Sequence, residues 1–114
     1  MSDQTAANMP RAWLDVMAER VRQITVEGWT SVADDARGIG DLAAASACYA
    51  LFAAERDIWR DAGKHKLYPP MYWPWHKDWW KPTNRRRDLV KAGALILAEI
   101  ERLDRASYQS GDEA

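Results

Sequence analysis

Apolar residues recur at steps of three and four in three segments of the chain, which is the spacing of one face of an α-helix. These segments are about 10–27, 41–61 and 84–105. No segment alternates apolar and polar residues as a strand does, and the chain has no internal repeat and no coiled-coil heptad. The pattern predicts an all-α protein, a small bundle of three main helices.

Turn and capping residues place the ends of these helices. Pro10 is suited to the first turn of a helix, and Gly28 ends the first helix. Thr83 or Asn84 can cap the third. The stretch 29–40 mixes Asp, Thr, Ser and Gly without a period and is predicted to be a loop.

The second helix begins with a run of small residues, 43–47. Small side chains let a neighbouring helix approach closely, so we expect the helices to cross here. At 114 residues the chain fits one domain. We predict a flexible N-terminus over 1–9, a helical domain over 10–106 and a flexible polar tail over 107–114.

The long loop at 63–82 is rich in tryptophan and proline, and its prolines keep it from forming a long helix. Its four tryptophans are Trp73, Trp75, Trp79 and Trp80. Loops of this length in small domains are usually functional or disordered, and the aromatic content argues against disorder. The tryptophans either form a binding surface or cap a small core.

Three consecutive arginines, Arg85, Arg86 and Arg87, open the third helix. Cations are mildly unfavourable at a helix N-terminus, so these side chains need an anion. One candidate is the phosphate of a ligand. The other is internal, the pair Asp34 and Asp35 or the nearby Asp41.

The turn after the first helix carries further candidate chemistry. Trp29 offers a stacking face next to Gly28, and Arg22 lies one turn before the helix ends. Adjacent aspartates can bind Mg²⁺, although such pairs usually cap a helix or face water. If a metal binds, we expect Glu19, Asp34, Asp35 and Asp41 to hold it. His65 and His76 are too isolated to form a zinc site.

Composition and charge narrow the classes of function. The net charge of −1 argues against direct DNA binding and gives no attraction to a membrane surface. No apolar run approaches the ~20 residues that span a bilayer, and the first residues lack the features of a signal peptide. Cys48 is the single cysteine and lies among alanines, so we expect an inert, packed thiol in a reducing cytoplasm.

Several motifs together resemble a family of small uncharacterised bacteriophage and prophage proteins. The motifs are Glu19-Arg20-x-Arg22-Gln23, Glu27-Gly28-Trp29-Thr30, Asp34-Asp35, Asp41-Leu42-Ala43, Cys48-Tyr49-Ala50, Trp73-Pro74-Trp75, Trp79-Trp80-Lys81-Pro82 and Arg86-Arg87-Asp88-Leu89-Val90-Lys91-Ala92-Gly93-Ala94-Leu95-Ile96. The likeness covers about Glu19 to Arg105. It implies a phage-encoded protein that works in the cytoplasm of the host cell.

The chain is also loosely similar to the MazG-like all-α nucleotide pyrophosphohydrolases. Those enzymes hold Mg²⁺ with a Glu-Glu-x-x-Glu group on one helix and a Glu-x-x-Asp pair on the next. Here the second helix offers Asp41, with Leu42 and Ala45 where further carboxylates would be expected. Such a scaffold would bind a nucleotide without cutting it.

We therefore predict a binding protein for a nucleotide-like or cyclic-nucleotide ligand, which would sequester a host defence signal without hydrolysing it. We predict no catalytic residue and no cofactor. The expected ligand-binding residues are Arg22, Trp29, Asp34, Asp35, Trp73, Trp75, Trp79, Trp80, Arg85, Arg86 and Arg87.

Two other functions remain open. One is a Mg²⁺-dependent nucleotide pyrophosphohydrolase, and the other is a module that presents its tryptophans to a host protein. A short chain with many exposed tryptophans also predicts a homo-oligomer.

Overall fold

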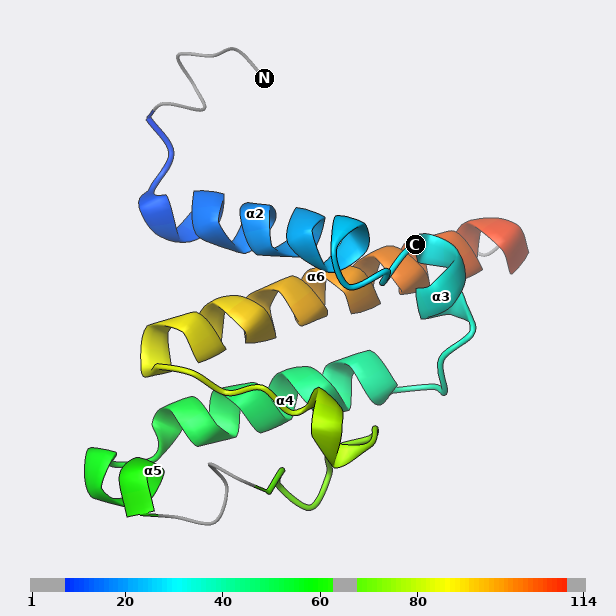
Figure 1. Ribbon diagram of the computed structural model, residues 1–114. Coiled ribbons are helices and arrows are strands. Elements are labelled where there is room, and N and C mark those ends of the chain that lie inside the picture. Colours follow the sequence, from blue (N-terminus) through cyan, green and yellow to red (C-terminus); the bar gives the residue numbers. More distant parts are fainter. Residues whose placement is uncertain (1–7, 63–67, 111–114) are drawn as a thin grey trace.

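The computed structural model describes residues 8–62 and 68–110, and over these residues the chain is helical with no strand (Figure 1). The prediction of an all-α fold is confirmed. The elements are α2 (Arg11–Thr25), α3 (Ser31–Asp35), α4 (Asp41–Ala54), α5 (Asp57–Ala62), the 3₁₀ turn η2 (Lys77–Trp79) and α6 (Arg85–Ser110).

The first predicted helix corresponds to α2, with Pro10 as its N-cap residue. Gly28 follows the helix with a φ of +76°, in the left-handed region that glycine adopts at little cost. The Trp29 N–H then donates to the Gln23 carbonyl at 2.9 Å. The glycine turn therefore folds Trp29 back against the end of α2.

The predicted loop at 29–40 contains a short helix, α3, which the sequence reasoning missed. The Thr30 hydroxyl accepts a hydrogen bond from the Ala33 N–H at 3.3 Å and caps this helix. Five residues are too few to show a helical period, so only the capping threonine indicated it.

The predicted helix at 41–61 is two helices, because the chain turns extended at Glu55 with a ψ of 146°. Arg60, on α5, explains the break. Its guanidinium donates to the Phe52 carbonyl at 2.7 Å, at the end of α4, and to the buried Asp88 of α6 at 2.9 Å. The break therefore lets α5 turn back and tie the end of α4 to α6.

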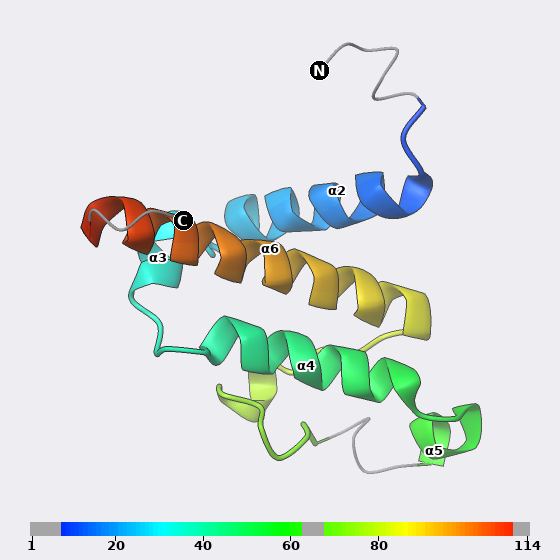
Figure 2. The same ribbon diagram turned by 180° about the vertical axis from the view of Figure 1, so that it is seen from behind.

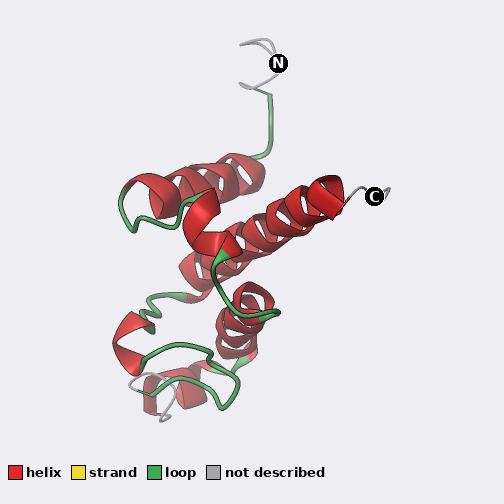
Figure 3. Cartoon of the chain, turned by 90° about the vertical axis from the view of Figure 1, so that its right-hand side faces the viewer, coloured by secondary structure: helices red, strands yellow, loops and turns green. Residues whose placement is uncertain are grey.

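Helix α6 lies between α2 and α4 and also packs against α3 (Figures 1 and 3). Small residues make this packing close, as predicted for the start of α4. Ala45 is fully buried, and the Ser46 hydroxyl donates to the Ala92 carbonyl at 2.8 Å. On the other side, a Cβ on Gly93 would lie 3.2 Å from both methyl groups of Val16.

The described part of the tryptophan-rich loop passes over one side of the helices and places two of its indoles in the core. Trp80 stacks on Tyr49 with ring centroids 4.6 Å apart, and Trp73 meets Tyr49 edge-on at 5.7 Å. The Tyr49 hydroxyl accepts a hydrogen bond from the Lys81 N–H at 3.1 Å. The tryptophans thus divide into core residues and surface residues.

The third predicted helix continues five residues beyond its expected end at Arg105, to Ser110. Arg105 donates to Asp35 of α3 at 2.8 Å, which fixes this end of α6 to the loop region. No helix in the described ranges combines the length and the apolar character that crossing a membrane requires.

Candidate functional site

Three indoles, one guanidinium and one imidazole surround a cavity of about 270 Å³, which we call the aromatic cleft. It is lined by Trp29, Arg37, Trp75, His76 and Trp79. The Arg37 guanidinium lies 4.5 Å from the Trp75 ring centroid and 5.2 Å from that of Trp29. The two indoles meet edge-on at 5.5 Å. Aromatic faces beside a cation suit a flat, electron-rich ring.

Local hydrogen bonds of the loop position the cleft. The Trp73 indole N–H donates to the His76 carbonyl at 3.1 Å, and the His76 imidazole accepts from the Asp78 N–H at 3.1 Å. The second bond caps η2, which carries Trp79. Trp75 in turn packs edge-on against the buried Trp73 at 5.3 Å. One side of the cleft is therefore anchored in the core.

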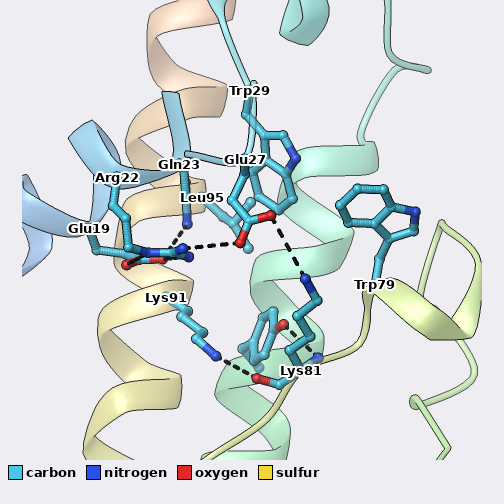
Figure 4. Close-up of a pocket in the computed structure, with 10 residues that line it drawn as sticks. Glu19, Arg22, Gln23, Glu27, Trp29, Trp79, Lys81, Lys91 and Leu95 are labelled. Atoms are coloured by element: carbon cyan, nitrogen blue, oxygen red, sulfur yellow. Dashed lines mark hydrogen bonds and ion pairs between the residues drawn. The ribbon is translucent and has the colours of Figure 1, made fainter. Parts of the chain in front are cut away.

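A second, polar pocket adjoins the aromatic cleft and shares Trp29 and Trp79 with it (Figure 4). Besides the shared indoles, this polar pocket is lined by Glu19, Arg22, Gln23, Glu27, Tyr49, Lys81, Lys91 and Leu95. Its volume of about 30 Å³ holds two or three waters, at ~10–15 Å³ each, and no ring. A ligand would therefore occupy the cleft and reach the polar pocket at its edge.

Glu19 is the buried anion of the polar pocket. It accepts hydrogen bonds from Arg22 at 2.7 and 3.0 Å and from the Gln23 amide at 3.2 Å, and it also pairs with Arg87. Burial alone would raise the Glu19 pKa, but these donors and cations bring it below its ordinary value. Glu19 is thus a charged, fully partnered carboxylate.

Two lysines provide positive charge beside the indoles. Lys81 lies with its ammonium 5.3 Å from the Trp79 ring centroid and 3.8 Å from a Glu27 carboxylate oxygen. The Lys91 ammonium lies 5.6 Å from the Tyr49 ring and donates to the Lys81 carbonyl. Burial lowers the pKa of Lys91. Figure 4 shows Lys81 extending between Trp79 and Glu27.

The two aspartates predicted as ligand-binding residues lie outside the lining of the aromatic cleft. Asp34 is buried and bonded to Arg20 at 3.0 Å, and Asp35 is bonded to Arg105. Neither pairs with the three arginines that open α6. Arg20 also donates to Glu101 at 3.0 Å and to the Trp29 carbonyl at 3.3 Å. The aspartates fix the shape of the fold around the cleft and do not line it.

The three arginines do have internal partners, as one of the two sequence interpretations held, but the partners differ from those expected. Arg85 pairs with Asp57 at 2.8 Å, and Arg86 pairs with Asp15 at 2.8 Å. Arg87 pairs with Glu19. All three lie on the first turn of α6, and none of them lines the aromatic cleft.

Trp73 and Trp80, which were also predicted to bind the ligand, are core residues and do not line the cleft. They are 9% and 6% exposed. Trp29, Trp75 and Trp79 do line the cleft, and Arg22 lines the polar pocket.

The predicted metal ligands are not brought together. Asp41 accepts the Gly38 N–H at 3.1 Å, while Glu19, Asp34 and Asp35 each pair with different arginines. In residues 8–62 and 68–110, no three His, Cys, Asp or Glu side chains gather as metal ligands would. His65 lies outside the described residues.

The sequence reasoning missed Arg37, Lys81 and Lys91. Arg37 lies in the stretch 29–40 that was predicted to be a loop, where no periodicity indicates which side chains meet, so its contacts with two indoles were not predicted. Lys81 directly follows Trp79 and Trp80 in the sequence, and a lysine next to an aromatic residue could have indicated a cation beside the stacking surface.

No protein-family model, no curated protein and no solved structure matches this chain. The structure defines an all-α protein with an aromatic cleft beside a polar pocket. Any function has to be argued from that geometry.

Proposed function

We propose that the protein binds a nucleotide-like ligand in the aromatic cleft and does not hydrolyse it. The observation that carries the proposal is the shared wall of Trp29 and Trp79, which has a ring-sized cleft on one side and two lysines on the other. A ligand that combines a flat ring with an anionic group matches both sides at once.

The ring of the ligand would stack on the indoles. Trp79 is 45% exposed and forms the accessible side of the cleft, whereas Trp75 is braced against the core. Stacking of a base on an aromatic side chain contributes about 1–3 kcal/mol. At about 270 Å³ the cleft lies just below the ~300–1,000 Å³ of typical small-molecule sites, so it would take one ring system and leave the rest of the ligand outside.

The anionic part of the ligand would meet Lys81 and Lys91. The Lys81–Glu27 distance of 3.8 Å is long for an ion pair, so this ammonium can turn towards a phosphate at little cost. Lys91 is anchored by the Lys81 carbonyl and adds a second positive charge. A mononucleotide or a cyclic nucleotide has the right size for this arrangement.

Binding without hydrolysis is favoured by the partners of the carboxylates. Phosphoanhydride cleavage of the MazG-like kind needs several carboxylates that converge on Mg²⁺. Here the candidate acids each accept from arginine or backbone donors in separate places. The resemblance to phage proteins adds a setting, in which the protein would sequester a nucleotide signal of the host's defence.

The test is a titration of the protein with mono-, di-, tri- and cyclic nucleotides, with and without Mg²⁺, read by native mass spectrometry and by tryptophan fluorescence. We expect an adduct of fixed stoichiometry. Trp79→Ala should weaken binding about ten- to a hundredfold. The matched control is Trp59→Ala, because Trp59 is 63% exposed and lies on α5, away from the cleft.

Lys81→Gln tests the anionic contact in the same titration, with Lys77→Gln as its control. The first should lower affinity for the phosphorylated ligand and leave affinity for the nucleoside unchanged. Conversion of the nucleotide to products would instead favour the pyrophosphohydrolase. Absence of any adduct would refute the proposal and favour a host protein as the partner.

A further inference from the structure

One side of α6 is apolar and exposed along four turns. Leu89, Ile96, Ile100 and Leu103 are 50%, 48%, 49% and 52% exposed, and their steps of seven, four and three place them on the same side of the helix. Figure 2 shows the helices from behind, and no described segment crosses in front of α4 and α6 in that view. The tryptophan-rich loop runs over the opposite side (Figure 1).

The neighbouring helices extend this apolar face. On α4, Ala43, Ala47 and Ala50 face Ile96 and Ile100 across a groove of about 280 Å³. On α2, Trp13 and Met17 are 60% and 46% exposed, and the helical period puts them on the side of α2 away from Glu19, which faces the polar pocket. We call the surface formed by these residues and the α6 stripe the back face.

The polar groups at the groove are already partnered. The Ser46 hydroxyl donates to the Ala92 carbonyl, and Glu99 accepts from Arg102 at 2.6 Å. The back face can therefore be covered by an apolar surface without leaving a buried charge or hydroxyl unpaired.

We propose that the back face binds the back face of a second copy of this chain, as a two-fold symmetric dimer. The face is self-complementary, because it carries both a ridge and a hollow. The ridge is Ile96, Ile100 and Leu103 on α6, and the hollow is the alanine-lined groove beside it on α4. A two-fold axis lets the ridge of each copy enter the groove of the other.

The charge pattern favours an identical partner over a membrane or an unrelated protein. Identical faces repel each other when they carry unpaired like charges, and the only ionic group lining the groove, Glu99, is neutralised by Arg102. A membrane-binding face would instead carry a rim of unpaired lysines and arginines. Arg86, near the stripe, is paired with Asp15.

The size of the back face also fits a dimer. Leu89 to Leu103 covers about 21 Å of helix, and three helices at spacings of ~8–10 Å make it roughly 25 Å wide, so its area is on the order of 500 Å². This lies in the upper part of the ~300–600 Å² range for the largest apolar patch of a monomer. Two copies would together bury on the order of 1,000 Å², which is about the smallest buried area of a specific protein–protein interface.

Sedimentation equilibrium or light scattering on the whole chain tests the proposal. We expect the wild-type chain to show twice the mass of one chain at micromolar concentration. Ile100→Glu should convert it to monomer, because each copy would have to bury a carboxylate in the alanine-lined groove of the other. Ile39→Glu is the matched control and should stay dimeric, since Ile39 is 94% exposed and lies before α4.

Ala47→Glu tests the groove independently of α6 and should also give monomer. Circular dichroism has to show that both variants keep the helical content of the wild type, which is expected because neither side chain belongs to the buried core. A wild-type monomer at all concentrations, or a dimer that persists in both folded variants, would overturn the proposal. Binding to lipid vesicles by a monomeric wild type would overturn it as well. None of these readouts depends on the nucleotide proposal.

Discussion

Replacing Arg20 with methionine should destabilise the protein by about 3–5 kcal/mol, the usual cost of removing one partner from a buried ion pair. Arg20 has a side chain only 7% exposed, and it holds the fully buried Asp34 at 3.0 Å. It also donates to Glu101 and to the Trp29 carbonyl, so three chain segments lose a contact at once. Methionine keeps the packing of the aliphatic stem, which isolates the electrostatic effect.

Without Arg20, the buried carboxylate keeps its ion pair with Arg37 but loses its hydrogen-bonded arginine. The Arg37 Nε atom lies 3.6 Å from Asp34, too far for a hydrogen bond. Glu101 is different, because its side chain is 41% exposed and can turn to water. The predicted loss of stability therefore comes almost entirely from the buried carboxylate of Asp34.

The assay is urea denaturation followed by circular dichroism, with the free energy of unfolding compared at equal m-values. Arg20→Met/Asp34→Leu should recover most of the lost stability, since an apolar pair leaves no buried charge. Arg105→Met is the control, because it breaks an Arg–Asp pair that is 30% and 40% exposed and should cost much less. The reasoning would be refuted if Arg20→Met cost less than about 1 kcal/mol, or if the double variant were no more stable than the single one.

Three further predictions concern the charges and turns around the cleft. Because the pKa of Glu19 is lowered in the fold, ionised Glu19 stabilises the protein above its unfolded pKa of about 4.3, and this stabilisation is lost as the pH falls below that value. In an acid titration, the free energy of unfolding should therefore fall less steeply for Glu19→Gln than for the wild type. Burial raises the Tyr49 pKa to about 12, so the free energy of unfolding should fall between about pH 10 and pH 12. An absorbance titration should find one tyrosine that ionises at higher pH than the others, and ionisation of all tyrosines near pH 10 would contradict this. Gly28→Ala should cost about 1–2 kcal/mol in thermal unfolding from backbone strain alone, because the new Cβ meets nothing within 4 Å; an unchanged Tm would show that the turn has relaxed.

The parts of the fold that the sequence predicts are those set by local periodicity. The apolar spacing of α2 and α6 depends only on which side of a helix is buried, and the glycine at position 28 ends α2 by its own backbone preference. The break after α4 depends instead on Arg60, whose partner Asp88 is 28 residues away. Nothing in residues 50–60 alone indicates that contact.

The candidate site was predictable in kind but not in detail. Clustered tryptophans near cations indicated a surface that can stack a ring, and Trp29, Trp75 and Trp79 do line one. Which indoles stay outside the core depends on how the loop crosses Tyr49, a contact between segments about thirty residues apart. The same limitation applies to Asp34, because its partner Arg20 lies 14 residues away on a different helix, and no local spacing indicates that pairing.

The central position of α6 constrains how the chain can acquire its structure. Helices α2 and α4 have 15 and 14 residues, near the length at which isolated helices are marginal in water, and both pack mainly on α6. During synthesis, they therefore have no stable surface to dock on until α6 has left the ribosome. Folding should be a single late event, and a chain cut within α6 should lose its whole tertiary structure at once.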